Sequence, residues 1–390
     1  MRILSATVHG FRNLQETDLT FSPGVNLVLG RNGEGKTNLL EALNYLALGR
    51  SHRSGKPEEM INFDKDSLHV ALEVEEDSGS VLSCEFGLER GGRRRFRMDG
   101  ENVRRRADLV GRLVTVFFNP ESIRLVRGAP QRRRHFTDHG MSEFDPLFLS
   151  HLTSLQRVTR QKTGLLRDLK KGLTNPAEAR RELDSWNREL SSHAAEVCAG
   201  RWEYAQLLTP FAQDNYNSIT DSKLAMHFRY RPNLESVKKR LENNDENPFQ
   251  KEDLAADIFA EMDYIMDSEI RRGRPLIGPQ LDDFEVLLDG VDLRVYGSQG
   301  ETRSAAIAMI LARSDVLFRK RNIRPVLFFD DIFSELDRHR TRRLQELSSW
   351  DHQVFVATAR RDDVAGWSPD EMKAWNVQGG GITEDADDLT

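Results

Sequence analysis

Cysteine is scarce in this chain, whose 390 residues include only Cys84 and Cys198. Two cysteines so far apart match neither a disulfide framework nor a Cys-x-x-Cys metal site, which favours a reducing compartment. Long apolar runs are also missing, since no stretch reaches the about 18 residues that a membrane span needs. The opening segment, MRILSATVHGFRNL, lacks the apolar core of a secretory signal. We therefore expect a cytoplasmic protein that makes no contact with the membrane.

Neither sign of charge dominates the sequence. The formal net charge is -6, and four acidic residues fall within the last seven positions. The distribution of charge along the chain is therefore more informative than the total. Residues 381–390 are predicted to form a disordered acidic tail.

Apolar patterning separates two kinds of sequence. Within residues 1–120, runs rich in β-branched residues and bounded by Gly, Pro or Asn predict strands. Farther along, apolar residues recur every three or four positions, which predicts a helix at 146–171 and a long helix that starts after Asn175. The polar stretch 231–252 predicts an exposed excursion, followed by a short helix near 253–271. Strand patterns then return in FEVLLD, RPVLFFDD and HQVFVATA.

The strongest motif follows the apolar run VNLVL and precedes a predicted helix. It matches GxxxxGK[ST], a P-loop, and consists of Gly30, Arg31, Asn32, Gly33, Glu34, Gly35, Lys36 and Thr37. Glycines allow backbone N–H groups to turn toward phosphate oxygens, and the helix N-terminus adds positive potential. We predict that these residues bind a nucleotide, that Lys36 reaches the β and γ phosphates, and that the Thr37 hydroxyl ligates Mg²⁺.

A second acidic motif ends the apolar run PVLFF. Asp330 and Asp331 follow it directly. A buried strand that ends in two carboxylates can place Asp330 at the metal and Asp331 beside the γ-phosphate, where it would orient the attacking water. Lys36, Asp330 and Asp331 are therefore the predicted catalytic residues, and Thr37 and Asp330 the predicted metal ligands.

A third motif opens the apolar helix SAAIAMILARSDVLF. Ser298, Gln299, Gly300 and Glu301 stand at its predicted N-terminus, where a hydroxyl, free amides and the helix dipole suit anion recognition. The motif is similar to a variant ABC signature. Serine is also a common plain N-cap, and both interpretations remain open from the sequence.

Several segments across almost the whole chain resemble the RecF family in the same order. They are Phe11-Arg12-Asn13-Leu14, GRNGEGKTNLLEALNYLALGRSHR, Asn119-Pro120-Glu121 with RLVRGAPQRRRHF, the Ser-Gln-Gly signature and FFDDIFSELD. The family segment Gly-Pro-His-Arg-Asp-Asp is changed here to Gly278-Pro279-Gln280-Leu281-Asp282-Asp283.

This resemblance implies an α/β fold: an ABC-type P-loop ATPase head with an inserted α-helical lobe that carries a short helical hairpin. The expected lobes are 1–140 and 276–380 for the ATPase and 141–275 for the insert. The resemblance also implies ATP and Mg²⁺ as cofactors, and an ATP-dependent homodimer in which Ser298, Gln299, Gly300 and Glu301 face the nucleotide of the partner. Implied macromolecular partners are double-stranded DNA, duplex–single-strand junctions, RecR, RecO and RecA.

The resemblance further implies slow hydrolysis. Asp331 stands where transport ABC proteins carry Glu, and Ala359 where they carry a switch histidine.

No Gln occurs where the Q-loop of ABC proteins is expected. Asn119 or Glu121 could take its place. Alternatively, Asn119-Pro120 is merely a turn that ends a strand.

Arginine is clustered in a way that suits contacts with DNA phosphates. The predicted DNA-binding residues are Arg93, Arg94, Arg95, Arg104, Arg105 and Arg106. Further positive charge lies at Arg132–Arg134 and along the hairpin, which includes Lys162. Such runs are often only solvated faces. No zinc-finger spacing, RNP pattern or clear helix-turn-helix is present, so recognition of backbone and junction shape is predicted.

Three alternatives remain. An OLD-type nuclease needs a Toprim acidic metal site, whereas Asp289-Gly290-Val291-Asp292 fits a hairpin turn. The ATP-binding subunit of a transporter is disfavoured by Ala359 and by the helical insert. An SMC-like tether needs a longer coiled coil than this hairpin provides.

Overall fold

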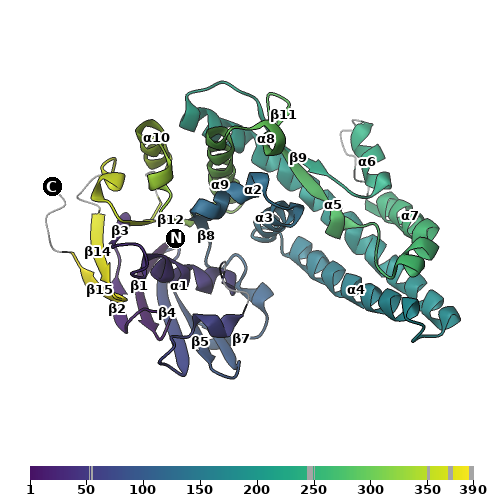
Figure 1. Ribbon diagram of the computed structural model, residues 1–390, viewed down its shortest axis with the longest axis horizontal. Coiled ribbons are helices and arrows are strands. Elements are labelled where there is room, and N and C mark those ends of the chain that lie inside the picture. Colours follow the sequence, from purple (N-terminus) through teal and green to yellow (C-terminus); the bar gives the residue numbers. More distant parts are fainter. Residues whose placement is uncertain are drawn as a thin grey trace. The chain divides into compact units, whose positions relative to one another are not determined.

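The computed structural model describes residues 1–51, 53, 56–243, 249, 251–348, 352–367 and 372–385 (Figure 1). The chain divides into two compact units, of which the first comprises Met1–Ile123, Asp214–Lys223 and Ala306–Thr390. The second comprises Arg124–Gln213 and Leu224–Ala305. Among the described residues, no helix has both the length and the apolar character to cross a membrane.

These unit boundaries differ from the lobes expected at residues 140 and 275. Helix α2 (Arg124–Arg127) packs with α8 (Leu293–Tyr296), and α3 (Pro130–Ser142) packs with β10 (Asp283–Leu288). Both helices therefore join the second unit. The predicted boundary at 140 followed the onset of helical periodicity. Periodicity reports the type of an element and not the unit in which it packs.

The first unit contains a six-stranded antiparallel sheet in the order β2-β1-β4-β5-β6-β7. Strands β4 and β5 bury every second residue, so one face packs on the core and the other meets solvent. The strands are β1 (Arg2–His9), β2 (Thr17–Thr20), β4 (Ser67–Glu75), β5 (Val81–Glu89), β6 (Arg94–Met98) and β7 (Glu101–Val103).

A second sheet in the same unit has the order β15-β14-β3-β13-β12-β8 and is parallel except for β15. Its strands β3, β12 and β13 are buried at every position, which explains their uninterrupted apolar sequences. The strands are β3 (Val25–Leu29), β8 (Thr115–Phe118), β12 (Val326–Asp330), β13 (Val354–Thr358), β14 (Met372–Gln378) and β15 (Gly381–Glu384).

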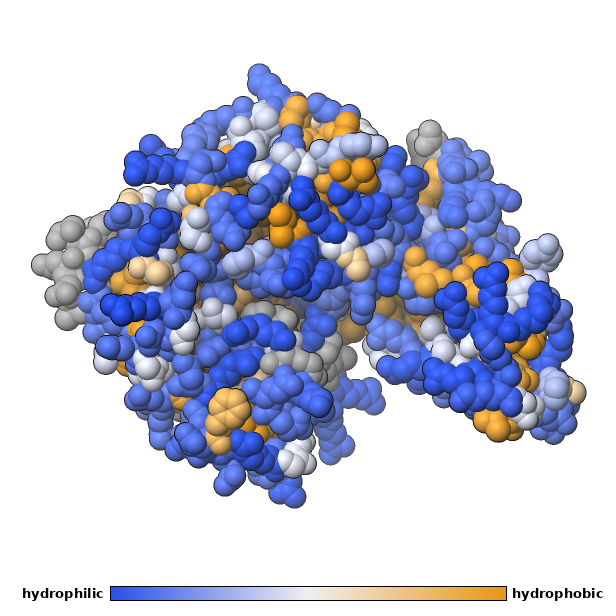
Figure 2. Space-filling model, in the orientation of Figure 1, coloured by the Kyte–Doolittle hydropathy of each residue, from blue (hydrophilic) through white to orange (hydrophobic). Residues whose placement is uncertain are grey.

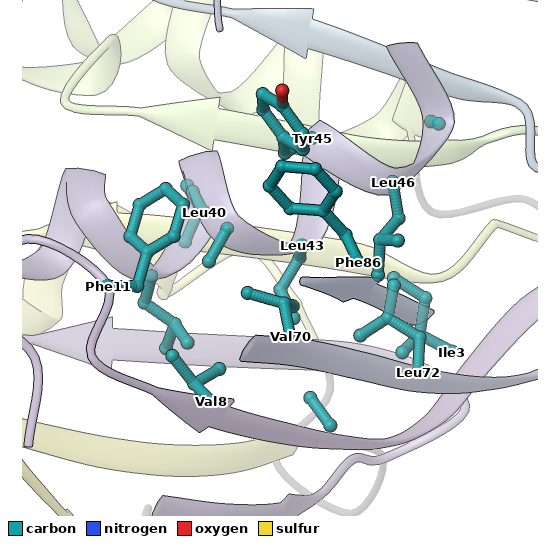
Figure 3. Close-up of a cluster of buried hydrophobic side chains, with 14 of the residues drawn as sticks. Ile3, Val8, Phe11, Leu40, Leu43, Tyr45, Leu46, Val70, Leu72 and Phe86 are labelled. Atoms are coloured by element: carbon teal, nitrogen blue, oxygen red, sulfur yellow. The ribbon is translucent and has the colours of Figure 1, made fainter. Parts of the chain in front are cut away.

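Helix α1 (Lys36–Leu48) fills the core of this unit. Figure 3 shows its side chains Leu40, Leu43 and Leu46 packed with residues of the antiparallel sheet, namely Ile3, Val8, Val70, Leu72 and Phe86. The helix that follows the P-loop is therefore fixed by burial of its apolar face. Helix α10 (Arg338–Ser348) and the part of α9 (Gln299–Arg321) from Ala306 onward belong to the same unit.

The predicted disordered tail is wrong for its first residues. Residues 381–384 form strand β15, which pairs with β14 through a two-residue turn at Gly379 and Gly380. Both glycines have positive φ, 53° and 79°, as the tight hairpin turn requires. Composition alone missed this turn. Residues 386–390 of the predicted tail lie outside the described residues.

The second unit is mainly helical. It contains the predicted hairpin, formed by α4 (Pro146–Lys170) and the long α5 (Pro176–Thr220), of which the part to Gln213 belongs to this unit. Asp145 caps α4 through its carboxylate, which accepts a hydrogen bond from the Phe148 amide. The helix predicted near 253–271 is α7 (Lys251–Arg272).

The excursion predicted at 231–252 is partly wrong, because α6 (Glu235–Glu242) lies within it and buries Val237. Just before it, β9 (Met226–Arg231) alternates buried and exposed residues and pairs with β10 (Asp283–Leu288). Strand β10 also pairs with β11 (Val291–Asp292), and α8 (Leu293–Tyr296) follows. Asp289 and Gly290 form the predicted hairpin turn, both with positive φ.

A buried ionic network joins the elements of the second unit. The Arg201 guanidinium, with 3% of its side chain exposed, donates two hydrogen bonds to Asp138, at 2.8 and 2.9 Å, and one to Asp282, at 2.8 Å. Asp282 also accepts hydrogen bonds from the Tyr230 hydroxyl and the Asn233 amide. The Gly278–Asp283 segment therefore supplies a structural carboxylate. Both cysteines are buried and free.

Candidate nucleotide-binding site

The P-loop connects β3 to α1 in the first unit, as the sequence predicts. Gly33 and Gly35 have φ values of 87° and 126°, which side-chain-bearing residues rarely adopt. At Gly30 a Cβ atom would lie 2.5 Å from the Val377 carbonyl oxygen, so the neighbouring strand β14 excludes any side chain. Three glycines of the motif are therefore required by backbone conformation or by close packing.

Lys36 lies within the loop, with 6% of the residue exposed. Its ammonium group donates to the carbonyl oxygens of Gly30 and Arg31, at 2.8 and 3.1 Å. The lysine side chain therefore folds back onto the backbone of Gly30 and Arg31. Gly35 occupies the N-cap position of α1 and has no side chain to cap the first amides of the helix.

Thr37 and Asp330, separated by 293 positions, meet at the end of β12. The Thr37 hydroxyl donates to the Asp330 carboxylate at 2.8 Å. Burial raises the pKa of Asp330 to about 6, and the adjacent Asp331 carboxylate adds to the increase. The hydrogen bond from Thr37 and the positive charges of Arg53 and Lys36 oppose it. The P-loop and the acidic motif thus form a single site.

The donor atoms at this point suit Mg²⁺, a hard cation that takes oxygen ligands and is often bound through one or two carboxylates together with phosphates. Among the described residues, no group of three or more His, Cys, Asp and Glu side chains could hold a metal by itself. Thr37 and Asp330 are the residues that would hold the ion.

Asp331 has an unusual backbone, with a φ of 52°. Its amide donates to the Ala357 carbonyl of β13 at 2.9 Å, and its own carbonyl accepts from the Ser334 hydroxyl. Non-glycine residues with positive φ are uncommon and cluster at functional sites. The neighbouring segments therefore hold the backbone of Asp331 in this conformation.

The signature residues Ser298, Gln299, Gly300 and Glu301 belong to the second unit and open α9. Ser298 and Glu301 form a capping box, in which the Ser298 amide donates to the Glu301 carboxylate at 2.8 Å. The Glu301 amide donates to the Ser298 hydroxyl at 3.2 Å. The N-cap interpretation of Ser298 is thus confirmed, and Gln299 and Gly300 occupy the first turn.

The chain matches the family model of the RecF/RecN/SMC N terminal domain over residues 2–378. It is 33% identical over 377 residues to the DNA replication and repair protein RecF of Ligilactobacillus salivarius, which covers 96% of this chain and 95% of that protein. This chain belongs to the RecF family. The RecF of Heliobacterium modesticaldum is 32% identical over 384 residues, with 95% of each chain covered.

Two solved structures are similar to this chain in fold. The recombination mediator protein RecF-ATPrS of the RecFOR pathway superposes with a TM-score of 0.87 at 26% identity, over 99% of this chain and 98% of that one. An Smc head bound to the C-terminal winged-helix domain of ScpA, at 14% identity and a TM-score of 0.57, shares the fold alone. The predicted α/β fold, an ABC-type ATPase head with an inserted helical lobe, is confirmed.

Sequence reasoning missed a buried carboxylate beside the P-loop of this RecF-family chain. Glu41 of α1 is 1% exposed and accepts two hydrogen bonds from Arg12, at 2.6 and 2.8 Å. It also accepts one from the Ser51 hydroxyl, and Arg53 lies 3.6 Å away. The segments that resemble the RecF family include Arg12, Ser51 and Arg53. The resemblance did not indicate that these three residues all contact Glu41.

The predicted DNA-binding arginines separate into two groups. Arg93 and Arg95 line a hollow of about 260 Å³ on the outer face of the antiparallel sheet, together with His69 and Arg97. Arg94 is exposed on β6, whereas Arg104 and Arg105 follow β7 and are also exposed. Arg106 begins the short helix η2 (Arg106–Leu109). Arg93 and Arg95 of the predicted set therefore line the hollow.

Other predicted positive groups are structural. Arg133 is 1% exposed and pairs with Asp283 at 2.8 Å, and Lys162 is buried against Glu269 at 2.7 Å. The Asn119 side chain accepts a hydrogen bond from the Ser122 hydroxyl in a local turn after β8. This contact fits the interpretation of Asn119-Pro120 as a turn that ends a strand.

Proposed function

We propose that this chain binds ATP with Mg²⁺ at the P-loop and hydrolyses it slowly, as a nucleotide switch. The observation that carries the proposal is the contact between Thr37 and Asp330 beside the buried Lys36. The hydroxyl of Thr37, the carboxylate of Asp330 and the ammonium group of Lys36 lie beside a glycine-rich loop. These are the groups that hold a metal-bound triphosphate in P-loop proteins. The RecF structures named for ATPrS and ATP support the same ligand.

In this proposal each residue has one role. The backbone amides of Gly30–Thr37 bind the phosphates, and Lys36 neutralises the β and γ groups. Thr37 and Asp330 hold Mg²⁺, which polarises the γ-phosphate when bound. Asp331 orients the attacking water, and its short side chain makes hydrolysis slow. Ser298, Gln299, Gly300 and Glu301 bind the triphosphate held by a second copy, so that ATP joins two subunits.

We further propose that the ATP-closed homodimer grips double-stranded DNA at duplex–single-strand junctions and that hydrolysis releases it. Because the chain belongs to the RecF family, its partners in recombinational repair would be RecR and RecO, and its action would help RecA to load. Contacts to the DNA backbone would come from exposed arginines, of which Arg93 and Arg95 have the most defined setting.

The DNA proposal is tested by fluorescence anisotropy of labelled duplex, gapped and single-stranded DNA, with and without ATP. We expect gapped and duplex DNA to bind only with ATP. Ser298→Arg should abolish this binding, because the larger side chain obstructs the approach of a second copy, while ATP binding persists. A wild-type protein that binds ATP but no DNA at low salt would leave an ATPase with another partner as the better account.

The arginine hollow makes a separate prediction. Arg95→Ala should weaken duplex binding and lower the slope of log affinity against log salt by about 0.9, the value for one lost phosphate contact. Arg2 lies on strand β1 of the same sheet but outside the hollow, and pairs with Glu75 at 4.0 Å, so Arg2→Ala is the matched control and should change the slope less. Equal slopes for the wild type and Arg95→Ala, measured by titration at several salt concentrations, would remove the hollow from the DNA surface.

A further inference from the structure

The turn between β14 and β15 binds the rim of the P-loop. Both of its amides donate to one residue, since the Gly379 amide bonds the Glu34 carboxylate and the Gly380 amide bonds the Glu34 carbonyl at 3.0 Å. The turn is itself held by Gln15, whose backbone N–H donates to the Gly380 carbonyl at 2.9 Å. Residues near both ends of the described chain thus converge on the apex of the P-loop.

Asn13 binds the same part of the loop. Its side-chain amide donates to the Glu34 carbonyl at 3.1 Å and to the Gly33 carbonyl at 3.5 Å. Its oxygen accepts from the Asn38 side chain at 2.7 Å, which fixes the orientation of the Asn13 amide. Asn13 is therefore held by the first turn of α1 while it holds the loop that precedes this helix.

These contacts determine where the loop amides point. In a trans peptide unit the carbonyl of one residue and the N–H of the next point in opposite directions. Because Asn13 and Gly380 both hold the Glu34 carbonyl, the Gly35 N–H must point away from them. Backbone N–H groups directed into the concave side of such a loop are the groups that bind phosphate.

The space around the turn leaves no room for a side chain at Gly380 but leaves room for one at Gly379. A Cβ atom at Gly380 would lie 1.8 Å from the Asn13 carbonyl oxygen. At Gly379 nothing lies within 4 Å of the same atom. Both residues have positive φ, so a substitution strains the turn at either position. Only the change at Gly380 also displaces Asn13.

We infer that Asn13 and the Gly379–Gly380 turn are positioning elements that hold the P-loop in its phosphate-binding shape, with Glu34 as their anchor. The motif predicts that Glu34 contacts the nucleotide. In this inference its side chain instead accepts a hydrogen bond from the Gly379 amide and so holds the loop in place. The inference rests on the proposed binding of ATP at this loop. It assigns to the C-terminal hairpin a role in nucleotide affinity.

The test compares Gly380→Ala with Gly379→Ala in the full chain. Gly380→Ala should weaken binding of a fluorescent ATP analogue by about tenfold, the effect of losing one or two hydrogen bonds. Gly379→Ala, whose Cβ atom has no neighbour within 4 Å, should change affinity by less than about threefold. Thermal melting of both variants without nucleotide measures how far each substitution destabilises the fold, which separates a general loss of stability from a specific loss of affinity.

Variants of Glu34 provide the second measurement. Glu34→Gln retains an oxygen that can accept from Gly379, whereas Glu34→Ala removes it, so the glutamine variant should bind ATP more tightly than the alanine variant. Both should raise KM more than they lower kcat. If Gln and Ala weaken binding equally, the carboxylate itself contacts the nucleotide or metal and the inference is overturned.

The outcomes separate the two proposals. If wild-type protein binds no ATP, the proposed function fails and the inference fails with it. If wild-type protein binds ATP and Lys36→Ala does not, but Gly380→Ala binds as tightly as Gly379→Ala, only the positioning role is overturned.

Discussion

Lys36→Ala should lower the affinity for ATP by roughly 30-fold to several-thousand-fold, which corresponds to the about 2 to 5 kcal/mol lost when one partner of a buried charge contact is truncated. The wild-type ammonium group is already held in the loop by the Gly30 and Arg31 carbonyls, so it needs little reorganisation to reach a phosphate. Isothermal titration with ATP and Mg²⁺ measures the change.

Lys65→Ala is the matched control for that experiment, because Lys65 is an exposed lysine in the loop before β4. It should leave ATP affinity within about twofold, since an exposed charge outside the site contributes little. Thermal melting of both variants checks the fold. Retention of full affinity by Lys36→Ala with an intact fold would contradict the assignment of this loop as the phosphate site.

Arg201→Met should reduce the free energy of unfolding by about 3 to 5 kcal/mol, the usual cost of removing one partner from a buried ion pair. The substitution leaves the carboxylates of Asp138 and Asp282 inside the second unit without their cation. Urea unfolding followed by circular dichroism measures the loss.

Arg180→Met, on the same helix α5, provides the comparison. Arg180 pairs with Asp267 at the surface, where 55% and 60% of the two side chains are exposed, so its loss should cost less than about 1 kcal/mol. Adding Asp282→Asn to Arg201→Met should recover part of the stability, because a neutral amide is cheaper to bury than a carboxylate. Equal losses for Arg201→Met and Arg180→Met would show that the network is not the stabilising element we describe.

The parts of the site that the sequence predicts are local in the chain. The P-loop follows from glycine spacing between a strand and a helix, and Asp330 from its place at the end of a buried strand. Their meeting follows because β3 and β12 are parallel strands in one sheet, so both motifs end at the same edge.

The parts that the sequence does not predict depend on partners far apart in the chain. Nothing local to Glu34 indicates that its partner is Gly379, and nothing near Arg133 or Lys162 indicates that their charges are buried. Charge runs reveal sign but not exposure. Strand β15 was missed because an acidic composition concealed a Gly-Gly turn.

The strand order around the P-loop also has a consequence for synthesis. Strand β3, which presents the loop, lies between β13 and β14 and pairs with both. At about 5 to 20 residues per second on the ribosome, tens of seconds separate the emergence of Leu29 from that of Val354. Until then β3 has no neighbour in its sheet. A growing chain therefore cannot pair the strand that presents the P-loop until β13 has been made, and the proposed nucleotide site is incomplete in any shorter product.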